Sequence, residues 1–111
     1  MKIICNNIIP FKGFTALTLW PFIFVRNDEA WKFSGETERH EEIHGEQQKE
    51  MLIVFFLIWY GIEWFVKLCY YHNRMTAYKN ISFEREAYNN QQNIIYLDQR
   101  KPFAWVKHIK H

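Results

Sequence analysis

A short segment in the first half of the chain, "HEEIH" at residues 40–44, has the residue types and the spacing of a zinc-binding helix. Side chains at positions i and i+4 lie on one face of a helix, about 6 Å apart at Cβ. His40 and His44 could therefore each place a ring nitrogen about 2.0–2.1 Å from one Zn²⁺. Glu41 is turned by about 100° from His40, which leaves it free to accept a proton from water at the ion. The segment predicts a metal centre with Glu41 as general base; the alternative is a solvated helix face whose histidines bind nothing.

A third ligand is needed, because a catalytic zinc ion usually has three protein ligands and one open position. The segment "FEREAY" at residues 83–88 offers two carboxylates. Glu84 shares a helical face with Tyr88, whereas Glu86 points about 200° away from Glu84, so only one of the two glutamates can face the histidines. The histidines elsewhere in the chain are further candidates: His72, His108 and His111.

The composition describes one small folded domain, residues 1–111. Hydrophobic residues make up 49% of the chain and aromatic residues 19%, which excludes a disordered protein. The net charge of +2 arises from 14 basic and 12 acidic residues. Because nucleic-acid binding needs a concentrated basic stripe, and the basic residues of the C-terminal tail are sparse, no nucleic-acid partner is expected.

The cysteines and the first residues favour a cytoplasmic location. Cys5 and Cys69 are isolated and form no metal-binding or disulfide pattern, which is typical of a reducing compartment. Asn6, Asn7 and Lys12 interrupt the apolar run at the N-terminus, so we expect no signal peptide.

The pattern of the chain predicts an α+β fold that positions these residues. Residues 2–26 are rich in β-branched and aromatic residues and predict strands, with Pro21 placing the second run at a sheet edge or a bulge. Ser34 or Thr37 could cap a helix that carries the histidines, and a further helix begins near Ser82. We expect a small antiparallel sheet packed on the histidine helix, a long apolar helix, the Glu-bearing helix and a short closing helix at residues 103–111.

The apolar helix, residues 51–71, allows three interpretations. Its first twelve residues carry no charge and span about 18 Å as a helix, well short of the ~30 Å of a bilayer's hydrocarbon core. The full segment reaches about 31 Å but includes Glu63 and Lys67, which could pair at i, i+4. We favour the core helix of a soluble domain, with peripheral contact at a membrane surface as the first alternative and a membrane span as the second.

The two motifs together resemble the gluzincin group of zincin metallopeptidases, in which an HExxH helix is followed by a helix that supplies a glutamate ligand. The resemblance implies that His40, His44 and Glu84 bind Zn²⁺ and that Glu41 is the catalytic base. The second motif of the group commonly reads E-x-x-x-D, but here Tyr88 stands where the aspartate belongs, so its hydroxyl would have to orient a ligand histidine. Asp28, Glu36 and Asp98 are the candidate acceptors for the free ring nitrogens.

The order of the segments along most of the chain also resembles a set of small bacterial proteins described as metallopeptidases. It implies an edge strand at residues 20–27 that binds substrate by main-chain pairing, and an oxyanion donor for which Tyr71, His72 and Arg74 are candidates. The expected function is hydrolysis of a peptide or protein substrate. The alternative is a non-catalytic, zinc-stabilised scaffold or membrane-surface module, and the oligomeric state stays open.

Overall fold

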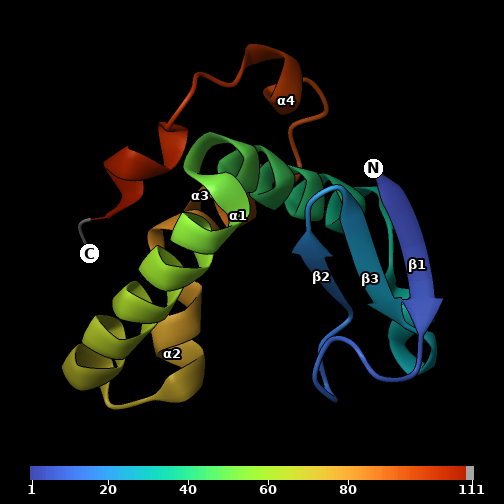
Figure 1. Ribbon diagram of the computed structural model, residues 1–111, viewed down its shortest axis with the longest axis horizontal. Coiled ribbons are helices and arrows are strands. Elements are labelled where there is room, and N and C mark those ends of the chain that lie inside the picture. The colour runs from blue at the N-terminus through green and yellow to red at the C-terminus, as the bar shows by residue number, and fades with distance from the viewer. Residues whose placement is uncertain (110–111) are drawn as a thin grey trace.

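The computed structural model describes residues 1–109 and places a small sheet at one end of a set of helices (Figure 1). The α+β class is confirmed. The elements follow one another as β1 (Lys2–Asn6), β2 (Ala16–Leu19), β3 (Phe22–Arg26), the 3₁₀ helix η1 (Asn27–Lys32), α1 (Gly35–Tyr71), α2 (Arg74–Lys79), α3 (Ser82–Asn90), α4 (Tyr96–Gln99) and the 3₁₀ helix η2 (Ala104–His108).

The sheet is mixed, not antiparallel as expected. Its strand order is β1-β3-β2, with β3 parallel to β1 and antiparallel to β2. Pro21 lies in the turn between β2 and β3, so it interrupts no ladder, and the predicted single run is a hairpin. Residues 20–27, the segment expected at the edge, therefore contain the central strand β3. The edge strand that lies against the helices is β2.

Helix α1 contains both helices that the sequence predicts, joined at a bend. Ser34 caps its start, where its hydroxyl accepts from the main-chain N–H of Thr37 at 3.2 Å. Leu52 has φ 56° and ψ 137°, which is not helical and is unusual for a residue with a side chain. It divides α1 into an N-terminal section, residues 35–51, and a C-terminal section, residues 53–71, that run in different directions (Figure 1).

The later helices are shorter than the sequence suggests. Helix α2, which precedes α3, was not expected, and α3 begins at Ser82 as predicted and ends at Asn90. Asn89 and Asn90 form the end of α3 and Asn93 follows it, and asparagine side chains compete with the helix for main-chain hydrogen bonds. The closing helix is a 3₁₀ helix over Ala104–His108, and the last two residues of that prediction lie outside the described part of the chain.

Helix α1 carries the histidines and α3 carries Glu84. Packing between α3 and the C-terminal section of α1 holds these two helices together. Phe56, Ile81, Phe83 and Trp105 form a buried apolar cluster between them. Glu63 accepts hydrogen bonds from the main-chain N–H of Ser82, at 2.9 Å, and from the Ser82 hydroxyl. A carboxylate at this position compensates the unpaired N–H groups at the start of α3.

Helix α1 is long and apolar enough to cross a membrane by length and composition. Length and composition alone do not distinguish a membrane-associated helix from the core helix of a soluble protein. In this structure Phe56, Glu63 and Lys67 are the buried residues of the C-terminal section of α1, and most of its other apolar side chains are exposed.

A candidate metal centre

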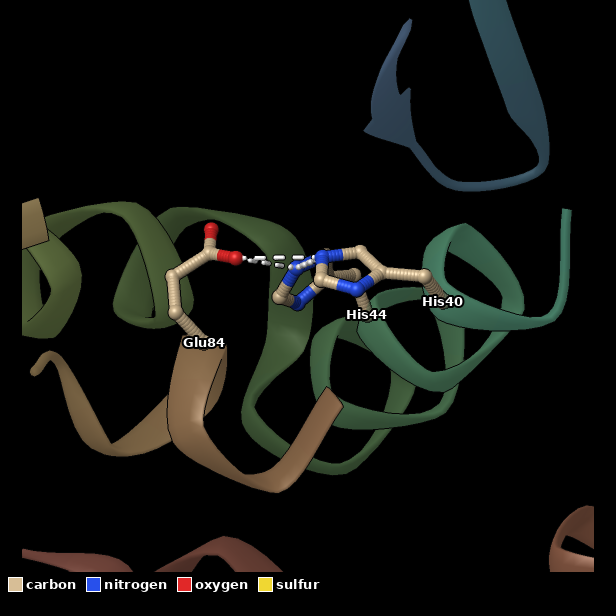
Figure 2. A group of neighbouring side chains, drawn as sticks. All are labelled: His40, His44 and Glu84. Carbon is tan, nitrogen blue, oxygen red and sulfur yellow. Dashed lines mark hydrogen bonds and ion pairs between the residues drawn. The ribbon is translucent and has the colours of Figure 1, made fainter. Parts of the chain in front are cut away.

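His40, His44 and Glu84 converge at the inner side of the bend in α1 (Figure 2). Glu84 Oε1 lies 3.1 Å from Nε2 of His40 and 3.1 Å from Nε2 of His44, and the two Nε2 atoms are 3.2 Å apart. All three side chains are buried. The glutamate comes from α3, so the arrangement joins side chains 40 or more residues apart in the sequence.

Each imidazole is held from behind by a glutamine. His40 Nδ1 lies 2.5 Å from Oε1 of Gln91, and His44 Nδ1 lies 2.8 Å from Oε1 of Gln47. The amide groups are fixed in turn, because Gln91 Nε2 donates to Glu36 and Gln47 Nε2 donates to the carbonyl of Phe83. Carboxylate and carbonyl oxygens only accept, so the amide oxygens must face the rings, and both Nδ1 atoms carry hydrogen.

This tautomer leaves two Nε2 lone pairs and a carboxylate oxygen facing one another. Three acceptors at 3.1–3.2 Å repel one another unless a proton or a cation lies between them. Ligand atoms bound to zinc at 2.0–2.1 Å in a tetrahedron are about 3.3 Å apart, which the triad matches closely. The donor set and its spacing therefore fit a divalent metal ion.

The electrostatics of the triad favour positive charge at its centre. Burial disfavours protonation of His44, but the Glu84 carboxylate outweighs it and raises the pKa of His44 to about 9. Burial would raise the pKa of Glu84, yet the two histidines hold it well below its ordinary value. In the metal-free protein a proton takes the place that a cation would fill.

Glu41 is held beside the triad by the edge strand β2. The hydroxyl of Thr18 donates to Glu41 Oε1 at 2.7 Å and contacts its carbonyl oxygen at 2.9 Å. Gln48, one turn further along α1 than His44, accepts from the N–H of Trp20 at 2.6 Å and donates to the carbonyl of Thr18 at 2.7 Å. These bonds fix β2 against the N-terminal section of α1 and fix the direction of the Glu41 carboxylate.

Tyr88 stands where the gluzincin motif has an aspartate, and its hydroxyl was expected to orient a ligand histidine. The structure does not show this contact. The ring of Tyr88 packs edge-on against the ring of His40, 4.5 Å between centroids, and its hydroxyl lies 3.4 Å from that of Tyr78. Burial raises the pKa of Tyr78 and of Tyr88, so both hydroxyls keep their protons at neutral pH. The tyrosine that contacts the triad by hydrogen bond is Tyr60, which donates to Glu84 Oε2 at 2.7 Å.

The other predicted site residues lie apart from the triad. Glu86 is paired with Arg100, at 2.5 Å, and accepts from Tyr96, at 2.7 Å. Tyr71 and His72 lie at the far end of α1, about 16 Å along the axis beyond Tyr60. The remaining candidates are also elsewhere. Arg74 begins α2, Asp98 belongs to α4 and Asp28 pairs with Arg26. His108 is not part of the triad, and His111 lies outside the described residues.

Of the three predicted acceptors, Glu36 supports His40, but through Gln91. The sequence analysis missed Gln47, Gln91, Thr18 and Tyr60. Gln47 had a signal, since it is three residues from His44 and therefore on the same helical face. The other three reach the site from distant parts of the chain, and no spacing in the sequence indicates them.

No protein-family model matches the chain, and comparisons with curated proteins and with solved structures find no match either. The resemblance to gluzincins therefore stays a prediction from the two motifs of the sequence.

Gln91→Met is expected to lower zinc affinity by about 10–100-fold, because it removes the acceptor that fixes the tautomer of His40. A competitive titration with a chromogenic chelator measures the change. Gln92→Met is the matched control, since Gln92 is an exposed neighbour, and it should bind zinc as the parent does. Equal affinities for the two variants would contradict an orienting role for Gln91.

Proposed function

We propose that this protein is a zinc-dependent metallopeptidase. The observation that carries the proposal is the convergence of His40, His44 and Glu84 at one point, with the carboxylate of Glu41 on the next residue of the same helix. Two histidines and a glutamate leave one coordination position open, which is typical of a catalytic zinc site and not of a closed structural one.

The residues around the triad can take the parts that peptide hydrolysis requires. A divalent ion held by His40, His44 and Glu84 would acidify a bound water and polarise a carbonyl oxygen. Glu41, which Thr18 holds in position, accepts the proton as the water attacks and then delivers it to the amine of the leaving group. Tyr78 keeps its proton because burial raises the pKa of its hydroxyl, and that hydroxyl lies 3.4 Å from the hydroxyl of Tyr88, whose ring packs against His40. We assign it as the donor to the developing oxyanion.

The substrate that we propose is an extended peptide segment that pairs with the outer edge of β2. Main-chain groups of Thr18 and Trp20 on that edge already bond to Gln48, so pairing is left to the Ala16 end of the strand. This is a shorter edge than the segment at residues 20–27 would have offered. We place the enzyme in the cytoplasm, and the free thiols of Cys5 and Cys69 are compatible with a reducing compartment.

One observation favours the non-catalytic alternative, a zinc-stabilised scaffold. The exposed fractions of the triad and of Glu41 are only 4–7%. A surface hollow of about 380 Å³ lies elsewhere, between Glu50, Leu97 and Arg100. A peptidase must therefore open the contact between β2, α1 and α3 to admit a substrate, whereas a scaffold needs no opening.

Zinc removal separates the two functions. The zinc-loaded protein is expected to cleave members of a mixed peptide library, to lose that activity after chelation, and to regain it when zinc is added back. Mass spectrometry of the products gives the cleaved bonds, and thermal melting follows the fold through the same cycle. A chain that binds zinc and gains stability from it, yet cleaves no peptide at any stage, would be the scaffold.

A further inference from the structure

The C-terminal section of α1 exposes a wide apolar surface. We call it the apolar face and define it by the ten large apolar side chains of residues 52–71 whose exposed fractions lie between 38% and 66%. These are Leu52, Val54, Phe55, Leu57, Ile58, Trp59, Ile62, Phe65, Val66 and Tyr70. If each contributes roughly 100 Å², the face covers about 1,000 Å², more than the ~300–600 Å² of the largest patch on a typical monomer.

The charged residues of this section are turned inward. Glu63 is buried against the start of α3, where it bonds to Ser82, and it accepts from the indole of Trp59 at 2.6 Å. Lys67 is also buried, and its ammonium group donates to the carbonyl of Ile109 at 3.0 Å. These are the section's two charges, so the apolar face carries none.

The shape of the face indicates a lipid phase and not a second copy of the chain. A dimer needs about 800 Å² from each partner, which the face could supply. A partner helix, however, packs on a stripe only about 100° wide. At 100° per residue the exposed side chains of the face cover more than half of the helix circumference. A packed helix would leave much of that surface in water, whereas acyl chains cover it completely.

The chain that follows supplies complementary charge. From His72 to Phe83 the residues include Arg74 and Lys79, both exposed, and no acidic residue. Juxtamembrane basic side chains are attracted to anionic headgroups, by about 1 kcal/mol each. The polar helices α2 and α3 lie along one side of the section (Figure 1), so crossing a bilayer would carry their polar groups into hydrocarbon. The section must instead lie along the surface.

We propose that the apolar face docks on a bilayer that contains anionic lipids, with the axis of the C-terminal section lying along the membrane surface. The side chains of the face enter the boundary between headgroups and acyl chains, about 5–10 Å deep. Docking depends on the outer side of α1 and not on the metal. If the metal centre is catalytic, its substrates are protein segments that lie close to the membrane surface.

The two cysteines provide a matched pair of probes, because both are exposed. Cys69 lies beside Phe65 and Val66 on the same side of the helix, near the C-terminal end of the apolar face, and Cys5 lies on β1. A nitroxide is attached to Cys69 in a Cys5→Ser variant and to Cys5 in a Cys69→Ser variant. With vesicles of phosphatidylcholine and phosphatidylglycerol, the label at Cys69 should become accessible to oxygen and protected from a water-soluble relaxing agent. The label at Cys5 should stay accessible to the water-soluble agent.

Flotation with the same vesicles measures the binding itself. The parent protein should float, and the double variant Ile58→Glu, Phe65→Glu should bind at least about tenfold more weakly. Ile94→Glu is the control, because Ile94 is 79% exposed but lies outside the face, and it should float as the parent does. Circular dichroism and zinc content confirm that the double variant is folded.

Three outcomes would overturn the proposal. A Cys69 label that stays in water with vesicles present would exclude lipid contact. A dimer in vesicle-free solution that protects the same label would assign the face to a second copy. Resistance of the vesicle-bound protein to extraction by alkaline carbonate would indicate a membrane span and not a surface helix.

Discussion

Glu41→Gln is expected to retain zinc and lose peptidase activity. The amide cannot accept the proton from the attacking water, and loss of a general base lowers rates by about 10²–10⁴-fold. The oxygen of the new side chain can still accept from Thr18, so the local structure should be unchanged. Steady-state cleavage of a peptide identified in the library, together with zinc analysis by mass spectrometry, measures both quantities on one sample.

Glu42→Gln is the control for this experiment. Glu42 is the next residue on the helix, but it lines a hollow with Met1 and Lys49, away from the triad. This variant should have the zinc content and the rate of the parent. If Glu41→Gln cleaved peptides within about tenfold of the parent rate, the proton acceptor would have to be another group, and the proposed mechanism would be wrong.

The second large effect is expected from Glu84→Gln, which should abolish tight zinc binding. The neutral amide is a poor zinc ligand although it keeps the size of the glutamate and can still accept from Tyr60. Because Glu84 also pairs with His40 and His44 in the buried interior, its loss should destabilise the metal-free protein by about 3–5 kcal/mol. Isothermal titration with zinc and urea unfolding measure the two effects.

Glu86→Gln is the matched control, two residues further along the same helix. Its amide oxygen can still accept from Gln47 Nε2, so the support of His44 is kept and zinc should bind as in the parent. The variant should unfold more easily, because Arg100 then loses a buried charged partner. Burial disfavours ionised Glu86, yet hydrogen bonds from Arg100, Gln47 and Tyr96 outweigh it and lower its pKa. Its stabilising effect is therefore present above the unfolded-state value of about 4.3, and it is lost as the pH falls through the lower folded pKa.

If the metal centre is as described, Glu84→Gln must lose tight zinc binding and Glu86→Gln must keep it. A Glu84→Gln variant that bound zinc with parental affinity, or a Glu86→Gln variant that lost it, would assign the third ligand to the other residue. The acid limb of the stability curve should also be shallower in Glu86→Gln than in the parent, because the contribution of Glu86 is removed while that of Glu84 stays, and this checks the role of Glu86 independently of zinc.

The local features of the fold could be predicted from the sequence because they depend on helical periodicity. The shared face of His40 and His44, the Ser34 cap and the start of α3 at Ser82 all follow from residue types a few positions apart. The 200° between Glu84 and Glu86 likewise explains why one reaches the triad and the other does not.

The remaining features depend on contacts between distant segments. The sequence separates the histidine helix from the apolar helix near residue 51, but without a glycine or proline there, nothing in the pattern indicates that the two join in one helix with a bend at Leu52. The insertion of β3 between β1 and β2 also has no local signal, and neither does the bond between Gln91 and His40. The apolar segment was expected in the core, but the inward orientation of Glu63 and Lys67 turns its uncharged side outward.

The two sections of α1 meet at an angle at Leu52, and Glu84 contacts both of them. One oxygen of its carboxylate faces the histidines of the N-terminal section, and the other accepts a hydrogen bond from Tyr60 of the C-terminal section. Widening the angle must lengthen one of these contacts. If the C-terminal section docks on a membrane as proposed, the lipid surface would therefore act on the spacing of His40, His44 and Glu84 through the angle at Leu52.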